Sequence, residues 1–529
     1  MAEKQSAIVH GNDVADATVG ETYPVEAAVA LPTVRRSQYL SKLIPKSSIG
    51  LTAIVIMVAT IDSINLGYDG TLMGSLNVMK TYIDYFSITT PLKGLLSSAT
   101  SIGGGVSCLF TAPLVDRIGR KKGMLLSAII CLIGAALQGA AQNTAMFIIS
   151  RIIIGIGTGI SGVAAPTYVA ETAPYKWRAF ALGLYFTCWN VGGMVASGVC
   201  YATENMNSTW AWRIPSLLQA LTAIMCMCIL PFVPESPRWL VYQDRREEAL
   251  EILAIAHADG DQSNIIVQTE FLEITDTLNY EKSVGKGLSY KEALGTPANR
   301  RRVMLGISVA VVTILPGSAI ITNYFGTMLD QAGISDAKTQ LEINIILSAF
   351  SLVLAVAGCF LAERLGRRML CMGSLAGCAI SFFLFGGLLS KYFNTTDKSA
   401  IYGTIACMFL FQGVYSFGLT PLTVIYPPEV LSYSIRASGM AITTLSFKLF
   451  TVFAAYVWPF ALQAITWKSY MINAAFDVLL VIWVYFTWVE TKSKTLEEID
   501  VFFDGEKHTD ALDVGEIAQA QGSKDLAQA

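Results

Sequence analysis

Charged side chains occur inside stretches of this chain that are otherwise apolar. Asp62, Asn65 and Asp69 follow the spacing i, i+3, i+7, which places all three on one face of a helix. Arg151 lies in a later apolar stretch, and a charge this close to hydrocarbon needs a partner. Asp69 and Arg151 are therefore predicted to pair. The residues alone leave open whether the pair is fixed or opens when the acid takes up a proton.

Lys448 lies about halfway along another apolar stretch, with about ten apolar residues beyond it. An unpaired ammonium group in hydrocarbon is strongly disfavoured, so the lysine needs a counter-ion or a route to water. The preferred hypothesis pairs it with Asp62, so that the two charges would neutralise each other within the site. The alternatives are the carboxylate of an acidic substrate and a lysine that reaches water along its own flexible stem.

The composition identifies an integral membrane protein. Hydrophobic residues make up 53% of the 529 residues and charged residues only 15%, against roughly 25% in a typical soluble domain. The net charge of −3 does not favour a nucleic-acid partner. Twelve stretches are long enough to cross a bilayer, at about 20 residues each. They lie at 48–68, 92–112, 124–142, 146–167, 179–200, 214–233, 303–327, 341–362, 369–390, 400–425, 437–458 and 470–488.

Polar segments divide these spans, and basic residues fix their orientation. The predicted order is a disordered cytoplasmic N-terminus (1–46), a six-helix half (47–233), a cytoplasmic linker with surface helices (234–302), a second six-helix half (303–490) and a cytoplasmic tail (491–529). Basic clusters fall on the linker side of the twelve spans, which is cytoplasmic by the positive-inside rule. The two glycosylation sequons, at Asn207 and Asn394, fall in loops on the opposite side.

Three sequence signals recur 247 to 258 residues apart, which indicates an internal repeat. "DRIGRKK" returns as "ERLGRR", a glutamate and arginine seven residues apart return as another such pair, and "PESPR" is answered by "VETKSK". We interpret these charges as a conformational latch, whose acids and arginines pair across the two halves, or bind helix carbonyls, in one conformation and separate in another. Its predicted members are Asp116, Arg117, Arg120, Glu171, Arg178, Glu235, Glu363, Arg364, Arg367, Glu429, Arg436 and Glu490. The alternative is that the cations only set the topology.

The remaining reactive residues do not predict an enzyme. All ten cysteines lie in predicted spans without a C-x2-C pair, and the three histidines lie outside the spans. The chain shows no nucleophile, metal or phosphate-loop constellation, so we expect no catalytic residues, no metal and no cofactor. Two parallel six-helix halves are instead typical of secondary transporters.

Over roughly residues 48–500 the chain resembles the sugar porter family of the major facilitator superfamily. The motifs that carry the resemblance are "DRIGRKK", "ERLGRR", "RIIIGIGTGISGVAAPTYVAETAPYKWRA", "PESPRWL" and "VETKSKTLEEID". "NLGYDGTLMGSLN" and "TPLTVIYPPEV" are similar to the fungal lactose and cellodextrin permeases. The resemblance implies an all-α major facilitator fold of twelve transmembrane helices in two pseudo-symmetric halves, alternating access, and sugar uptake coupled to protons. It also implies that Asp69 and Arg151 form the proton switch.

The expected substrate site departs from this family. Phe186, Ile314 and Ser318 stand where its members usually carry amides that hold sugar hydroxyls. Asn190, one turn after Phe186, partly substitutes for them, and aromatic side chains add stacking surface. The predicted substrate-binding residues are Asp62, Asn65, Trp189, Asn190, Ser318, Asn323, Tyr324, Thr423 and Lys448.

Proton symport of a sugar into the cell is therefore the expected function. Transport of an acidic or aromatic metabolite, in either direction, is the alternative, and a non-transporting nutrient sensor ranks third. The expected partners are a small-molecule substrate, a co-transported proton and the lipid bilayer, without nucleic acid. The protein is expected to be a monomer in the plasma membrane with both termini in the cytoplasm.

Overall fold

The computed structural model describes residues 43–283, 293–393, 397–431, 435–492 and 503. The regular elements within these ranges are helices, which confirms the all-α prediction. Most of the predicted N-terminal segment and tail lies outside the described residues.

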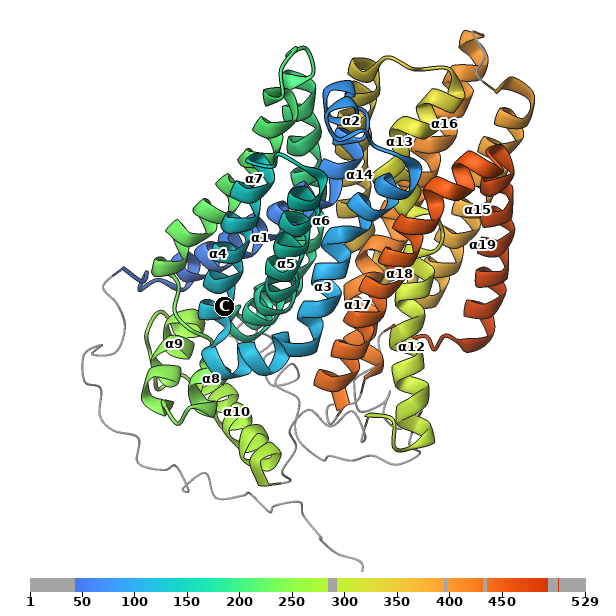
Figure 1. Cartoon of the computed structure of the whole chain (residues 1–529). Helices are drawn as coiled ribbons and strands as arrows, with labels where there is room; N and C mark the ends of the chain where they lie inside the picture. The colour runs from blue at the N-terminus through green and yellow to red at the C-terminus, as the bar shows by residue number, and fades with distance from the viewer. Residues whose placement is uncertain (1–42, 284–292, 394–396, 432–434, 493–502, 504–529) are drawn as a thin grey trace, which may run out of the picture. The chain divides into compact units, whose positions relative to one another are not determined.

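Six long helices form the first half (Figure 1). They are α1 (Ser48–Leu76), α3 (Thr90–Ile118), α4 (Arg120–Gly139), α5 (Thr144–Thr172), α6 (Tyr175–Thr203) and α7 (Trp210–Ile229), with the short α2 (Lys80–Phe86) between α1 and α3. The short η1 (Leu230–Phe232) ends the first half, and the linker contains α8 (Pro237–Tyr242), α9 (Arg246–Ala258) and α10 (Ile265–Ser283).

The second half also contains six predicted spans, two of which are interrupted. Its helices are α12 (Pro297–Ile314), α13 (Ser318–Ala332), α14 (Ala337–Leu365), α15 (Arg367–Tyr392), α16 (Lys398–Val414), the π-helical η2 (Tyr415–Leu419), α17 (Thr420–Val430), α18 (Arg436–Ala464) and α19 (Trp467–Thr487). The seventh span breaks at Gly317, whose φ of +105° suits a residue without a side chain. The tenth contains the π-helical turn. The sequence analysis predicted both spans as continuous helices.

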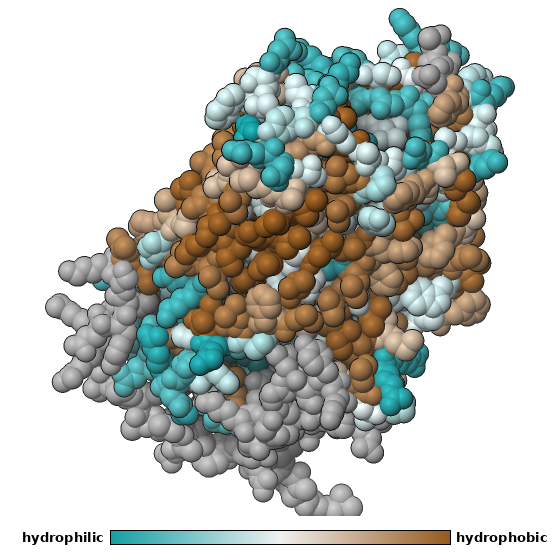
Figure 2. All heavy atoms as spheres, viewed as in Figure 1, coloured by the Kyte–Doolittle hydropathy of each residue, from teal (hydrophilic) through white to brown (hydrophobic). Residues whose placement is uncertain are grey.

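All twelve predicted spans are helical. Eleven helical segments are long and apolar enough to cross a membrane, and α6 contributes the remaining predicted span. Large apolar side chains such as Leu479 and Phe486 are exposed on the outside, at 62% and 77%. Figure 2 shows a broad apolar band over the helices. Such a surface is stable only against hydrocarbon, so the chain is a multi-pass membrane protein.

The two halves meet along two seams. In one seam α3 packs against α18, and in the other α6 packs against α14. Within the first half, α1 packs along α6 and α3 along α5, where small residues let the backbones approach closely.

The linker helices are bonded to the first half. The amide of Ser48, at the start of α1, donates to Asp259 at 2.6 Å. Glu270 of α10 accepts from Arg178 of α6 at 3.0 Å and forms an ion pair with His257 of α9 at 2.9 Å. We call the end of the bundle that carries these helices the linker end, and the opposite end the far end.

The Glu270 cluster predicts an acid-sensitive attachment. Burial alone raises the pKa of Glu270, but bonding to His257 and Arg178 outweighs it and holds the pKa below its usual value. A carboxylate with a lowered pKa stabilises the fold above its unfolded pKa of about 4.3, and this contribution disappears as the pH falls through the folded value. Glu270→Gln should cost about 1–3 kcal/mol at neutral pH. It should also flatten the acid limb of thermal stability, measured between about pH 3 and pH 6. An acid limb identical to that of the wild type would contradict this assignment.

Candidate transport site

The predicted pair of Asp69 and Arg151 is present in the structure. The Arg151 guanidinium of α5 binds the Asp69 carboxylate of α1, and the two residues are only 2% and 4% exposed. Gln219 of α7 donates a second hydrogen bond to the same carboxylate oxygen at 3.0 Å. Gln219 was not predicted, although an amide inside the span at 214–233 was the available signal. The pair thus joins three helices of the first half.

Asp62 has partners other than the predicted one. The hydroxyl groups of Ser161 on α5 and Tyr185 on α6 donate to its two carboxylate oxygens, the latter at 3.3 Å. Lys448 forms no ion pair with Asp62, so the preferred hypothesis of an Asp62–Lys448 pair is wrong in this structure. The hypothesis assumed that the Asp62 carboxylate needs a cation, but two neutral hydroxyl donors already bind its oxygens.

The shared helical face of α1 is confirmed as a polar stripe. Asn65, between the two acids, accepts a hydrogen bond from Thr222 of α7 at 2.6 Å. All three side chains on the stripe are buried and bonded to neighbouring helices of the first half. Their polar atoms therefore fix how α1 sits against α5, α6 and α7.

Apart from Lys448, the other predicted substrate-binding residues lie in both halves, two on α6 of the first half and four in the second half. Trp189 and Asn190 lie on α6 beside the stripe, with the Trp189 ring against Gly70 of α1 and the Asn190 side chain buried without a hydrogen bond to any described residue. Ser318, at the start of α13, donates to the carbonyl of Thr313 at 3.1 Å.

The remaining three predicted residues have partners within the second half. The Asn323 amide donates to Ala319 at 3.3 Å, and the Tyr324 hydroxyl donates to the Ala455 carbonyl of α18. Thr423 donates to the carbonyl of Thr420 at 2.6 Å. The structure therefore does not bring all nine predicted side chains to one place.

Polar contacts between the halves gather at the far end. The Asn77 amide donates to the Asn323 carbonyl at 3.3 Å, and Lys93 donates to Thr327 at 3.2 Å. Tyr201 donates to Glu342 at 2.8 Å, and Asn344 donates to Ser197 at 2.7 Å. A further contact at this end is the hydrogen bond that Asn344 donates to Ser75 at 3.5 Å. The halves are thus closed on each other there.

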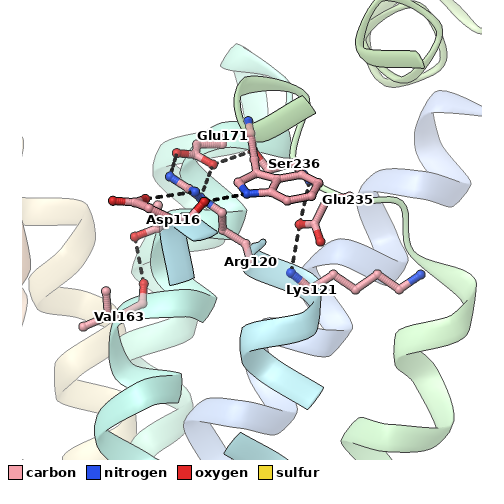
Figure 3. Close-up of polar contacts among 9 residues, drawn as sticks. Asp116, Arg120, Lys121, Val163, Glu171, Glu235 and Ser236 are labelled. Atoms are coloured by element: carbon pink, nitrogen blue, oxygen red, sulfur yellow. Dashed lines mark hydrogen bonds and ion pairs between the residues drawn. The ribbon is translucent and has the colours of Figure 1, made fainter. Parts of the chain in front are cut away.

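A cluster of charges holds the linker end of the first half. Arg120, at the start of α4, binds Glu171 at 2.9 Å and Asp116 at 3.0 Å (Figure 3). Glu235 accepts from the backbone amide of Lys121 at 2.9 Å and so caps the N-terminus of α4. Gly119 is required here because a Cβ would lie within 2.9 Å of the Glu235 carboxyl carbon.

The second half repeats this arrangement. Arg367, at the start of α15, binds Glu429 at 2.8 Å. Glu490 accepts from the backbone amides of Arg367 and Arg368 at 2.8 and 3.1 Å. Gly366 takes the place of Gly119, and a Cβ there would lie 2.8 Å from a Glu490 oxygen. The internal repeat predicted from the sequence therefore recurs in the structure, because both halves form the same arginine–glutamate pair and the same glutamate cap.

The pairing differs from the prediction in one respect. Acids and arginines pair within each half, not across the two halves, and the acids also cap helix N-termini. Binding to helix carbonyls, the predicted alternative, is present where Arg368 donates to the Tyr485 carbonyl at the end of α19. Among the other predicted members, Arg178 binds Glu270, Arg117 is exposed, and the Arg364 carbonyl accepts from Lys492 at 2.6 Å. The side chains of Glu363 and Arg436 lie outside the described part of the chain.

Comparison with known proteins decides the family. Residues 55–503 match the family described as "Sugar (and other) transporter". The chain belongs to this sugar transporter family. A high-affinity glucose transporter of Kluyveromyces lactis is 31% identical to this transporter over 84% of this chain and 83% of its own. The MFS-type transporter criB of Aspergillus cristatus is 26% identical over 88% and 97%.

Solved structures show the fold of this transporter. The proton:xylose symporter XylE bound to 6-bromo-6-deoxy-D-glucose superposes with a TM-score of 0.71 at 20% identity, over 86% of this chain and 100% of that one. An inward open conformation of the xylose transporter XylE from E. coli gives 0.69, also at 20% identity, over 85% and 99%. The predicted major facilitator fold is confirmed, and the transporter is not an enzyme.

The linker-end clusters of this transporter predict a kinetic phenotype. Arg120→Ala or Arg367→Ala should slow transport about tenfold, the effect of ~1.4 kcal/mol on a barrier, because each arginine holds helix ends that must move together. Substrate affinity and the amount of folded protein should change little. Initial uptake rates over a range of substrate concentrations would separate these effects. Lys122→Ala is the matched control, since Lys122 lies in the same first turn of α4 as Arg120 and is exposed. Unchanged rates in both arginine variants would leave the clusters with a role in topology alone.

Proposed function

We propose that this protein takes up a sugar by proton symport through alternating access. The observation that carries the proposal is the buried Asp69–Arg151 pair in a chain of this family. The similarity to a high-affinity glucose transporter and to a proton:xylose symporter supports a sugar as the substrate and a proton as the coupling ion.

Protonation of Asp69 provides the coupling step. The ionised carboxylate binds Arg151 and Gln219, which stabilises the present contacts of α1 with α5 and α7. A neutral acid loses the charge attraction to the guanidinium, and in a low-dielectric site this loss is large. Arg151 then becomes available to other acceptors, and α1 is released to move against α5. Substrate binding and protonation would both favour this release.

The far-end contacts define the conformational state under this proposal. The halves are bonded to each other at the far end, and the charge pairs at the linker end lie within each half, so the substrate path would open toward the linker end. The basic linker side is cytoplasmic by the positive-inside rule. We therefore assign an inward-facing state of a plasma-membrane protein, with both termini in the cytoplasm and Asn207 in an exposed outer loop. We also propose that the protein is a monomer.

Uptake into cells that lack their own sugar transporters tests this proposal. Labelled neutral sugars should accumulate above their external concentration, and a protonophore should abolish the accumulation without abolishing entry. Accumulation that survives the protonophore would exclude proton coupling. A panel of sugars that fails to enter at any pH would exclude sugar transport.

A further inference from the structure

Lys448 lies in the seam between the two halves and has no counter-ion. It projects from α18 across α3, where a Cβ built on Gly104 would lie 3.0 Å from its Cε and 3.3 Å from its Nζ. A Cβ on Gly105 would lie 3.7 Å from the lysine Cβ. Two consecutive glycines therefore make the space that the lysine side chain occupies.

The ammonium group lies at the depth of the polar stripe. Gly104 is the middle residue of α3, and Asp62 is the middle residue of α1. Lys448 lies two residues before the middle of α18. Substrate sites of such transporters lie near the bilayer midplane, where the two halves meet. The Lys448 side chain is half-buried at this depth.

The described groups around Lys448 leave its charge unbalanced. It forms no hydrogen bond or ion pair with the described part of the chain, and Asp62 is satisfied by Ser161 and Tyr185. The neighbouring ionisable group on α3 is the thiol of Cys108, which lies one turn beyond Gly104. A half-buried ammonium group at the depth of the bilayer midplane, without a counter-ion among the described residues, is suited to an anion that arrives with the substrate.

We propose that Lys448 binds a carboxylate of the transported molecule, so that the substrate is a sugar acid. This inference rests on the proposed function and narrows its substrate class. A single ammonium group matches the single charge of a carboxylate. A phosphate dianion would need a second cation, and the buried Arg151 is already paired with Asp69.

The proposal changes the charge carried in each cycle. One proton taken up by Asp69 and one carboxylate bound at Lys448 together move no net charge. A neutral sugar with one proton moves one positive charge. Transport of a sugar acid should therefore follow the pH gradient and be independent of membrane potential, whereas transport of a neutral sugar should respond to both.

Purified protein in proteoliposomes tests the inference. The probes are D-glucose, D-glucuronate, which differs from glucose by a carboxylate at C6, and D-gluconate, which carries the carboxylate at C1. At least one of the two acids should raise the thermal midpoint of the wild-type protein and be taken up under a pH gradient, and a potassium diffusion potential should leave its rate unchanged. Lys448→Met should weaken acid binding at least about tenfold, as expected for loss of a charge-assisted hydrogen bond. Lys448→Arg should retain most of the binding. Lys468→Met, at an exposed lysine, is the matched control.

The outcomes separate this inference from the proposed function. If only glucose binds and is transported, and Lys448→Met leaves this unchanged, the sugar-acid substrate is excluded and proton–sugar symport stands. If neither glucose nor the acids are bound or transported, the proposed function itself fails. Should Lys448→Met not fold, the wild-type protein decides the question, because a potential-independent uptake of either acid supports the inference and an absence of acid binding overturns it.

Discussion

Asp69→Asn is expected to abolish accumulation of substrate against a gradient while leaving exchange down a gradient. Asparagine has the size of aspartate and keeps an oxygen that can accept from Gln219, but it cannot take up a proton. The accumulation ratio in cells should therefore fall to the equilibrium value, with or without a protonophore. Counterflow of labelled against unlabelled substrate should persist. These two assays on one variant separate coupling from binding.

Asp84→Asn is the matched control for this prediction. Asp84 lies on α2 and is exposed, so the same chemical change there should leave accumulation intact. If Asp69→Asn concentrates substrate as the wild type does, the proton is carried elsewhere. Asp62 would then be the next candidate, because it is the other buried acid of the polar stripe.

Gly67→Val should abolish folding of the transporter. A Cβ on Gly67 would overlap the carbonyl oxygen of Trp189 and lie 2.6 Å from its carbonyl carbon, which are backbone atoms that cannot turn away. The substitution must push α1 away from α6 and misplace the polar stripe. We expect a cost above the about 1–3 kcal/mol that is typical of overpacking. Fluorescence-detected size exclusion after detergent extraction would show the loss of the monodisperse peak.

Gly198→Val provides the comparison. Gly198 lies on α6 as well, but a Cβ there meets no atom within 4 Å. This variant should extract and transport nearly as well as the wild type. A monodisperse, active Gly67→Val protein would show that α1 and α6 can separate without harm, and would contradict the packing argument.

The spans and the central ion pair could be predicted from the sequence because hydrocarbon imposes strong constraints. An apolar run of bilayer length has no stable alternative to a helix, and a charge within such a run needs a partner. Asp69 and Arg151 were recognised for this reason. Gln219 was not, because an uncharged amide in a span carries a weaker signal.

Other features depend on distances between side chains in the folded protein, which the spacing of residues along the sequence does not give. Asp62 and Lys448 both had to be explained, and pairing them was the simplest solution, but the neutral donors Ser161 and Tyr185 lie closer to the acid. The break at Gly317 and the π-helical turn at 415–419 occur within runs that remain apolar, so composition does not reveal them. The linker-end motifs were recognised as repeats, but only coordinates show that each arginine pairs inside its own half.

The attachment of the linker has a consequence for experiment. The linker helices are bonded to the first half through Asp259 and Glu270. In the proposed cycle they should therefore move with that half as one rigid body. The distance between a fluorophore on the exposed Gln243 of the linker and another on the exposed Met369 of α15 would then report how the two halves move relative to each other at the linker end. The efficiency of energy transfer between the two fluorophores, followed over time in a single molecule, would give the duration of each conformational change of the transporter.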